Sequence, residues 1–307
     1  MTFEIIGRDA EAHLDWLALL DAFREGHRLP KAEIGDTFLY RGKDTLLSRA
    51  AWIDGAGSLV KTANVFPGNP AKGLAMINGA VNLYDDEAGS LAALLDFHLV
   101  TKWKTAGDSL LGAAQLARKD SEVILIVGAG TVGQSLRQAY GALFPKARFL
   151  IWNRTPETAE AFAAGHPDTT AAPNLESAVK EADIITSATM SKEPLLHGDW
   201  LRPGQHVDLI GAYRPDMREV DDAALRRATI HVDSRATTIG HIGEIQIPLA
   251  DGTITEGDIR SDFYDIDRGA MSRRSDAEIT LFKNGGGAHL DLMASRYILS
   301  AWQAREG

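Results

Sequence analysis

The sequence predicts an α/β protein in two parts: an N-terminal α/β part with a mostly antiparallel sheet, and a second part with a doubly wound parallel sheet. Three observations support this. The chain has 307 residues, more than one hydrophobic core usually serves. Short apolar runs separated by Gly, Asp, Asn and Pro fill residues 36–84. From residue 121 onward, continuous apolar runs alternate with helical segments instead.

Composition and charge narrow the classes of function. Hydrophobic residues make up 45% of the chain and the net charge is −10, with no Lys/Arg run. A protein that binds nucleic acid without sequence preference needs a basic face, so we expect no nucleic-acid partner. The chain has no cysteine, and its nine histidines show no metal-ligand spacing. We therefore expect no disulfide, no Cys nucleophile and no metal site.

The first residues lack the basic start and apolar core of a signal peptide. No stretch approaches eighteen consecutive apolar residues, so we expect no membrane span and a cytoplasmic location.

The N-terminal part begins with a predicted helix over residues 8–27, where Trp16, Leu19, Leu20 and Phe23 recur at helical spacing. Predicted strands follow at 38–40, 45–53, 58–66 and 80–84. The segment 54–57, Asp-Gly-Ala-Gly, predicts a hairpin between the second and third of them. A predicted helix over 96–118 then leads to the second part.

The second part begins with the apolar run 123–127, which is typical of a strand buried on both faces of a parallel sheet. Further strands are predicted at 149–152, 184–187, 206–210 and 229–232, with helices at 156–164, 175–181 and 221–227. A last amphipathic helix covers 287–303. We assign residues 1–117 together with 286–307 to the first domain, and 118–285 to the second.

A complete G-x-G-x-x-G motif directly follows the first parallel strand and opens a helix. This context is the one that a Rossmann dinucleotide site requires. Gly128 permits a tight turn, Gly130 lets backbone N–H groups approach a pyrophosphate, and Gly133 lets the helix pack closely. The predicted cofactor-binding residues of this loop are Gly128, Ala129, Gly130, Thr131, Val132 and Gly133.

The end of the next strand bears on the choice between NAD and NADP. An acidic residue there would bind the ribose 2′-hydroxyl, but the sequence has Asn153, Arg154 and Thr155. Arg154 is suited to pair with a 2′-phosphate. We therefore expect NADPH as the preferred cofactor and NADH as the alternative.

Candidate substrate-binding cations lie in the N-terminal part. Lys61 interrupts an apolar strand, and Lys104 lies in the helix that leads to the second part. Both also have ordinary explanations: a solvated strand face for Lys61, and an i,i+4 pair with Asp108 for Lys104. Arg49 shares a face with Lys61 only if the hairpin loop has an odd number of residues, because side chains alternate along strands.

Taken together, these segments resemble the ornithine cyclodeaminase/mu-crystallin family over almost the whole chain. The matching segments are 60–69, 104–109, 128–133, 151–156, 182–189, 211–220, 232–234 and 280–285. Thr189, Met190 and Gly211, in or beside these segments, are expected to line the cofactor.

The resemblance implies a homodimer formed through the N-terminal domain, and a substrate carboxylate bound by a Lys and an Arg. The Lys matches Lys61, and the Arg matches position 104, where this chain has Lys. A further family arginine falls near Ile34, and Arg49 or Arg41 is the candidate substitute.

True cyclodeaminases carry an Asp at the position that Tyr213 occupies in this chain. We expect Tyr213 to contact the substrate. Mu-crystallin-like ketimine reductases also lack that Asp, prefer NADPH and carry the Asn-Arg-Thr element. The resemblance therefore implies the ketimine reductase branch.

The predicted function is NAD(P)H-dependent reduction of a cyclic or open α-imino acid, with Δ1-pyrroline-2-carboxylate and its product L-proline as the leading example. Lys61 and Lys104 would be the catalytic residues, since they would hold and orient the substrate carboxylate, and Lys61 or a water it positions would supply a proton. The alternatives are an ornithine cyclodeaminase or alanine-type dehydrogenase, and a non-catalytic NADPH-dependent binding protein.

Overall fold

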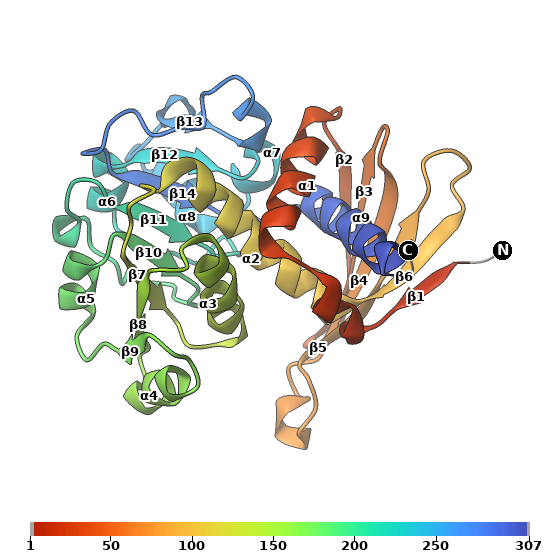
Figure 1. The fold of residues 1–307 in the computed structure, drawn as a ribbon, viewed down its shortest axis with the longest axis horizontal. Helices are drawn as coiled ribbons and strands as arrows, with labels where there is room; N and C mark the ends of the chain where they lie inside the picture. Colours follow the sequence, from red (N-terminus) through yellow and green to blue (C-terminus); the bar gives the residue numbers. More distant parts are fainter. Residues whose placement is uncertain (1–2, 306–307) are drawn as a thin grey trace. The chain divides into compact units, whose positions relative to one another are not determined.

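The computed structural model describes residues 3–305 of the chain (Figure 1). It divides into two compact units, the first ending at Lys104 and resuming at Gly287, and the second running from Thr105 to Gly286. The predicted first boundary, after residue 117, therefore falls too late. The reason is that helix α2 (Phe97–Leu116) is shared: beyond Lys104 it packs within the second unit, where a Cβ added at Gly112 would lie 2.6 Å from Cδ1 of Phe282.

In the described part of the first unit, six strands form one sheet in the order β1-β6-β5-β4-β3-β2. All neighbours are antiparallel except β1 and β6, as the predicted mostly antiparallel sheet requires. The bounds are β1 Glu4–Ile6, β2 Glu33–Arg41, β3 Asp44–Ile53, β4 Gly57–Val65, β5 Ile77–Tyr84 and β6 Leu91–Asp96.

The hairpin between β3 and β4 has an odd loop. Ile53 pairs with Gly57, so three residues, 54–56, form the connection, and Gly55 and Gly57 take φ values of 86° and 85° that favour glycine. In this register Arg49 lies directly opposite Lys61. Side chains of directly paired residues lie on the same face of a sheet, so the two cations share one face.

Helix α9 (Ala288–Ala304) covers that face by packing on β3, β4 and β5, and α1 (Trp16–Arg28) packs against α9 (Figure 1). The predicted single helix over 8–27 is wrong, because the chain forms a 3-10 turn at Arg8–His13 before α1 begins. Asp15 separates the two, since its carboxylate caps α1 by accepting from the backbone N–H groups of Leu17 and Ala18.

In the described part of the second unit, eight parallel strands form a sheet in the order β13-β12-β14-β11-β10-β7-β8-β9, which confirms the doubly wound prediction. The strands are β7 Val123–Val127, β8 Arg148–Trp152, β9 Thr169–Ala171, β10 Ile184–Ser187, β11 His206–Leu209, β12 Thr229–Val232, β13 Ile259–Ser261 and β14 Thr280–Lys283. The helices are α3 Thr131–Leu143, α4 Pro156–Ala164, α5 Leu175–Glu181, α6 Asp222–Arg227, α7 Arg235–Thr238 and α8 Gly243–Ala250. Short 3-10 turns lie at Pro70–Lys72 in the first unit and at Gly198–Trp200, Glu256–Asp258 and Phe263–Asp265 in the second.

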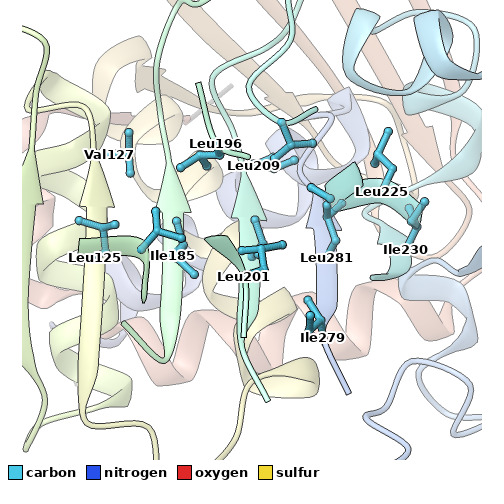
Figure 2. Packing of buried hydrophobic residues seen from close by; sticks show 14 of the residues in the cluster. Leu125, Val127, Ile185, Leu196, Leu201, Leu209, Leu225, Ile230, Ile279 and Leu281 are labelled. Carbon is cyan, nitrogen blue, oxygen red and sulfur yellow. The ribbon is translucent and has the colours of Figure 1, made fainter. Parts of the chain in front are cut away.

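The core of the second unit is aliphatic and runs across neighbouring strands. Leu125, Ile185, Leu209 and Leu281 come from β7, β10, β11 and β14 and pack side by side (Figure 2). Burial of such side chains contributes about 1.5–3 kcal/mol each. This packing fixes the carboxyl ends of the strands, from which the candidate cofactor loops emerge.

Among residues 3–305, the helices all lack the combination of length and apolar character needed to cross a bilayer.

Candidate functional site

The glycine motif forms the turn between β7 and α3. Gly128 has a φ of 109°, and a Cβ there would lie 2.8 Å from the carbonyl oxygen of Ala188. A Cβ at Gly133 would lie 2.2 Å from the carbonyl oxygen of Gly128, so α3 approaches the turn closely. A Cβ at Gly130 would meet no atom within 4 Å. The motif thus combines two tightly packed glycines with one that faces open space, as a pyrophosphate cradle requires.

The first turn of α3 is accessible. Gly130 caps the helix without a side-chain hydrogen bond; Thr131 is exposed and Val132 half-buried, whereas Ala129 is buried. The N–H groups at a helix start lack intrahelical partners and carry partial positive charge. These residues therefore fit the phosphates of a dinucleotide.

The residues after β8 divide into two roles. The side chain of Asn153 accepts from Ala129 N at 3.2 Å and donates to the Thr155 carbonyl oxygen at 3.1 Å, so it ties the glycine loop to the next turn. Arg154 and Thr155 are exposed, and Thr155 starts α4 without a side-chain cap. The guanidinium of Arg154 is therefore accessible to a ligand beside the glycine loop.

Two further loops follow β10 and β11. They carry the remaining predicted residues: Thr189 is half-buried, Met190 is 70% exposed, Gly211 is half-buried and Tyr213 is 58% exposed. The Arg214 guanidinium lies 5.6 Å from the Tyr213 ring centre, and Arg214 is itself paired with Asp216. A phenol here supplies no carboxylate, so the structure gives this position no group equivalent to the cyclodeaminase Asp.

The candidate substrate cations meet in the first unit. Lys61 is on the face of β4 covered by α9 and is only 6% exposed, so the solvated-strand alternative is wrong. Its Nζ donates to Oδ1 of Asp291 at 2.8 Å and to Oγ1 of Thr101 at 2.8 Å, and lies 4.7 Å from the ring centre of Phe97. Lys104 is also buried, with Nζ 3.7 Å from Oδ2 of Asp291.

Arg49 completes the cluster. Its guanidinium lies 4.0 Å from Oδ2 of Asp291 and pairs with Asp36 at 2.7 Å, and its side chain is 25% exposed. Arg41 instead pairs with Asp44 at the β2–β3 turn. Of the two candidates for the family's upstream arginine, the structure therefore brings Arg49 to the two lysines.

Asp291 is the residue that sequence reasoning missed. It lies on α9, is fully buried, and is within 4.0 Å of Arg49, Lys61 and Lys104. Burial raises the pKa of its carboxyl, but the charges of these cations outweigh that effect and hold the pKa below its usual value. A carboxylate between two leucines in an apolar helix was the available signal, since such a residue is rarely buried unless paired.

The same charges act on Lys61. Burial, together with the charges of Lys104 and Arg49, lowers its pKa to about 8 against the opposing effect of Asp291. The cluster is thus a buried cationic site that loses positive charge as the pH rises through about 8. Such a site suits a small carboxylate ligand.

The described residues contain no group of three or more His, Cys, Asp or Glu side chains arranged to hold a metal ion.

Residues 53–306 match the sequence profile of the ornithine cyclodeaminase/mu-crystallin family. The chain belongs to this family. The Δ1-pyrroline-2-carboxylate reductase of Paracoccus denitrificans is 51% identical over 296 residues, which cover 94% of each chain.

Solved structures agree in fold. The structure of Thermococcus litoralis Δ1-pyrroline-2-carboxylate reductase in complex with NADH and L-proline has a TM-score of 0.89 and 25% identity, covering 99% of this chain and 98% of that one. An archaeal alanine dehydrogenase dimer with bound NAD has a TM-score of 0.90 and 26% identity, covering 100% of this chain and 98% of the other. Because these two enzymes carry different names, the fold alone does not select a substrate.

Proposed function

We propose that this chain is an NAD(P)H-dependent imine reductase that converts a cyclic α-imino acid, with Δ1-pyrroline-2-carboxylate as the leading candidate, into the corresponding amino acid, L-proline. The observation that carries the proposal is the buried cluster of Arg49, Lys61 and Lys104 around Asp291. It supplies cations for a substrate carboxylate in a chain half identical to a reductase of that name.

The substrate role follows from the chemistry of an α-imino acid. Its carboxylate is the permanently charged group by which the substrate can be bound. Ammonium and guanidinium groups bind carboxylates through charge-assisted hydrogen bonds. Lys61 and Lys104 would bind and orient it, and Arg49 would add a planar fork at the accessible edge of the cluster. Once the carboxylate is held, the position of the adjacent imine carbon is restricted to a small region.

A nicotinamide dinucleotide, when bound, would supply a hydride for the imine carbon. A protonated imine is a better acceptor than a neutral carbonyl, because it already carries positive charge. The product amine takes up a further proton, and Lys61 or a water it positions is the candidate donor.

For the cofactor we infer a preference for NADPH over NADH. The Thermococcus litoralis and archaeal relatives bind NADH and NAD, so a nicotinamide dinucleotide as such is expected. The finer preference is supported by the accessible Arg154 and by the lack of a carboxylate at positions 153–155. A guanidinium beside the adenosine ribose would pair with a 2′-phosphate.

Three alternative functions make different demands on the site. Cyclodeamination is disfavoured because Tyr213 replaces the carboxylate expected in that chemistry. Reversible dehydrogenation of an open-chain amino acid would use the same cluster. A non-catalytic NADPH-dependent binding protein would need no pair of buried lysines.

The test follows NADPH absorbance with purified protein. Δ1-pyrroline-2-carboxylate, Δ1-piperideine-2-carboxylate and pyruvate plus amine are offered in turn, with NADH in parallel. Rapid oxidation with a cyclic imine supports the proposal, and oxidation only with pyruvate plus amine makes the chain an open-chain dehydrogenase. No oxidation, together with ammonia release from ornithine, would replace the proposal by cyclodeamination.

We further infer that the chain forms a homodimer through its first unit. Strand β2 is a sheet edge exposed along its whole length, and Phe38, Leu39 and Tyr40 on it and Trp52 on β3 are exposed apolar side chains. An exposed strand edge of this kind usually pairs with a strand of another chain or is covered by another element. The archaeal alanine dehydrogenase relative is a dimer, which supports the same expectation. We infer a cytoplasmic site of action, because the reduced cofactor that the reaction consumes is regenerated there.

A further inference from the structure

One buried carboxylate joins the loops that follow β10 and β11. Glu219 is 0% exposed. Its Oε1 accepts from Ser187 Oγ at 2.6 Å, from Thr189 N at 2.8 Å and from Thr189 Oγ1 at 2.7 Å. Its Oε2 accepts from the backbone N–H groups of Gly211 at 2.7 Å and Ala212 at 3.3 Å.

The five hydrogen bonds to Glu219 require a carboxylate at this position. All of these described partners are donors, and an ionised carboxyl group is the side chain that offers only acceptors. The two loops are also in close contact, because a Cβ at Gly211 would lie 1.9 Å from the carbonyl oxygen of Thr189. Any change that releases one loop from Glu219 therefore disturbs the other.

The backbone at Glu219 is also fixed, on the side that faces the core, by hydrogen bonds to Glu244. The backbone N–H of Glu219 donates to Oε2 of Glu244 at 2.7 Å, and that of Val220 donates to Oε1 of Glu244 at 3.1 Å. Burial and the nearby Glu219 raise the pKa of Glu244 to about 7, while Lys283 opposes this shift. The segment that carries Glu219 is thus anchored on the core side as well as on the loop side.

Strand order indicates what these loops are for. The chain adds β8 and β9 on one side of β7 and then β10 and β11 on the other, so the order reverses between β7 and β10. A doubly wound sheet binds a dinucleotide across that reversal. The glycine loop after β7 and Arg154 after β8 would take the phosphates and the adenosine half. The loops after β10 and β11 would then contact the nicotinamide half of the cofactor.

We propose that Glu219 is a positioning residue that holds the Thr189 and Gly211 loops in the conformation that binds the nicotinamide half of the cofactor. This inference rests on the proposed function, because it assumes a nicotinamide dinucleotide. Glu219 is buried behind the loops, so it acts through Thr189 and Gly211 and needs no contact with the cofactor.

The test compares two ligands on the full-length chain: NADPH, and 2′-phospho-ADP-ribose, which lacks the nicotinamide. In Glu219→Gln one acceptor oxygen becomes an NH₂ donor that faces other donors. We expect the Kd for NADPH to rise by about tenfold or more, since charge-assisted hydrogen bonds are among the stronger ones. The Kd for the fragment should stay within about twofold, because its contacts lie on the other side of the reversal.

The matched control is Glu193→Gln, which makes the same chemical change at an exposed position of the loop that follows β10 and should alter neither Kd. Should Glu219→Gln fail to fold, Ser187→Ala is the second variant. It removes one donor to Glu219 at a fully buried position that the proposal does not place against the cofactor, and the affinities for the same two ligands are compared. Unchanged NADPH affinity, or equal losses for both ligands, would overturn the inference. A wild-type chain that binds neither ligand would instead overturn the proposed function, and this inference with it.

Discussion

Lys61 Nζ and Oδ1 of Asp291 lie 2.8 Å apart, although 230 positions separate the two residues in the chain. Both side chains are buried, one on β4 and the other on α9. Removing one partner of a buried pair leaves an uncompensated charge, which costs about 3–5 kcal/mol. Helix α9 thus stabilises the cluster of Arg49, Lys61 and Lys104 electrostatically as well as by covering the sheet.

Replacing Lys61 by Met should reduce kcat/KM for imine reduction by about 100-fold or more, because the buried cation proposed to bind the substrate carboxylate is lost. The Kd for NADPH should stay nearly unchanged, since the predicted cofactor residues lie in the other unit. The matched control is Lys102→Met, since Lys102 lies on the same helix as Lys104 and pairs with Glu11. Steady-state kinetics and cofactor titration check both variants. An undiminished rate in Lys61→Met would remove this residue from the mechanism.

Carboxylate binding should weaken as the pH rises through about 8. Lys61 holds its proton below the pKa of about 8 and loses it above, so the cluster has one cation fewer at high pH. Pyrrole-2-carboxylate is a suitable probe, because neither its ring nitrogen nor its carboxylate titrates in this range. Its inhibition constant, measured between pH 6 and pH 10, should rise on the alkaline side.

The variant Asp291→Asn tests the same pH dependence of the inhibition constant in a second way. Asp291 raises the pKa of Lys61, so its loss should move the alkaline break to lower pH. Cofactor affinity and thermal unfolding serve as controls for folding. An inhibition constant that is flat with pH in the wild type would contradict the assignment of Lys61.

Arg154→Ala should raise the KM for NADPH by about tenfold to 100-fold while leaving that for NADH within about twofold, since only NADPH carries the 2′-phosphate. Arg148→Ala is the matched control: Arg148 is half exposed, pairs with Glu181 and lies at the opposite end of β8. Equal effects on both cofactors would mean that Arg154 does not discriminate between them.

Gly130 and Gly133 should respond differently to alanine. A methyl group at Gly130 has space and an allowed backbone conformation, so Gly130→Ala should unfold at nearly the wild-type temperature yet bind NADPH about tenfold or more weakly. A methyl group at Gly133 collides with the Gly128 carbonyl, so Gly133→Ala should lose about 1–3 kcal/mol of stability. Thermal unfolding and cofactor titration separate the two. A Gly130→Ala protein with undiminished affinity would argue against the pyrophosphate cradle.

The second unit was largely predictable because its signals are local. The apolar runs of β7, β10 and β12 match the structure residue for residue, as do helices α4 and α5. Each combines strong hydrophobic pattern with turn or capping residues at its ends. The prediction of one helix over 8–27 was wrong, because Asp15 has an extended backbone and caps the start of α1.

The site was less predictable because its contacts are not local. Lys61 and Lys104 stood out as cations in apolar surroundings, but only the register of the β3–β4 hairpin brings Arg49 to the same face. Asp291 and Glu219 were missed for the same reason. Their partners lie in distant segments, so the sequence alone does not reveal what satisfies these buried charges.

The most direct test of the central claim is a deuterium-transfer measurement. NADPH carrying deuterium at both C4 positions is mixed with the protein and Δ1-pyrroline-2-carboxylate, and the product is analysed by mass spectrometry. Transfer of hydride to the imine carbon predicts L-proline with one deuterium at C2, at a rate that falls sharply in Lys61→Met. Unlabelled proline, or no proline while the cofactor stays reduced, would contradict the account.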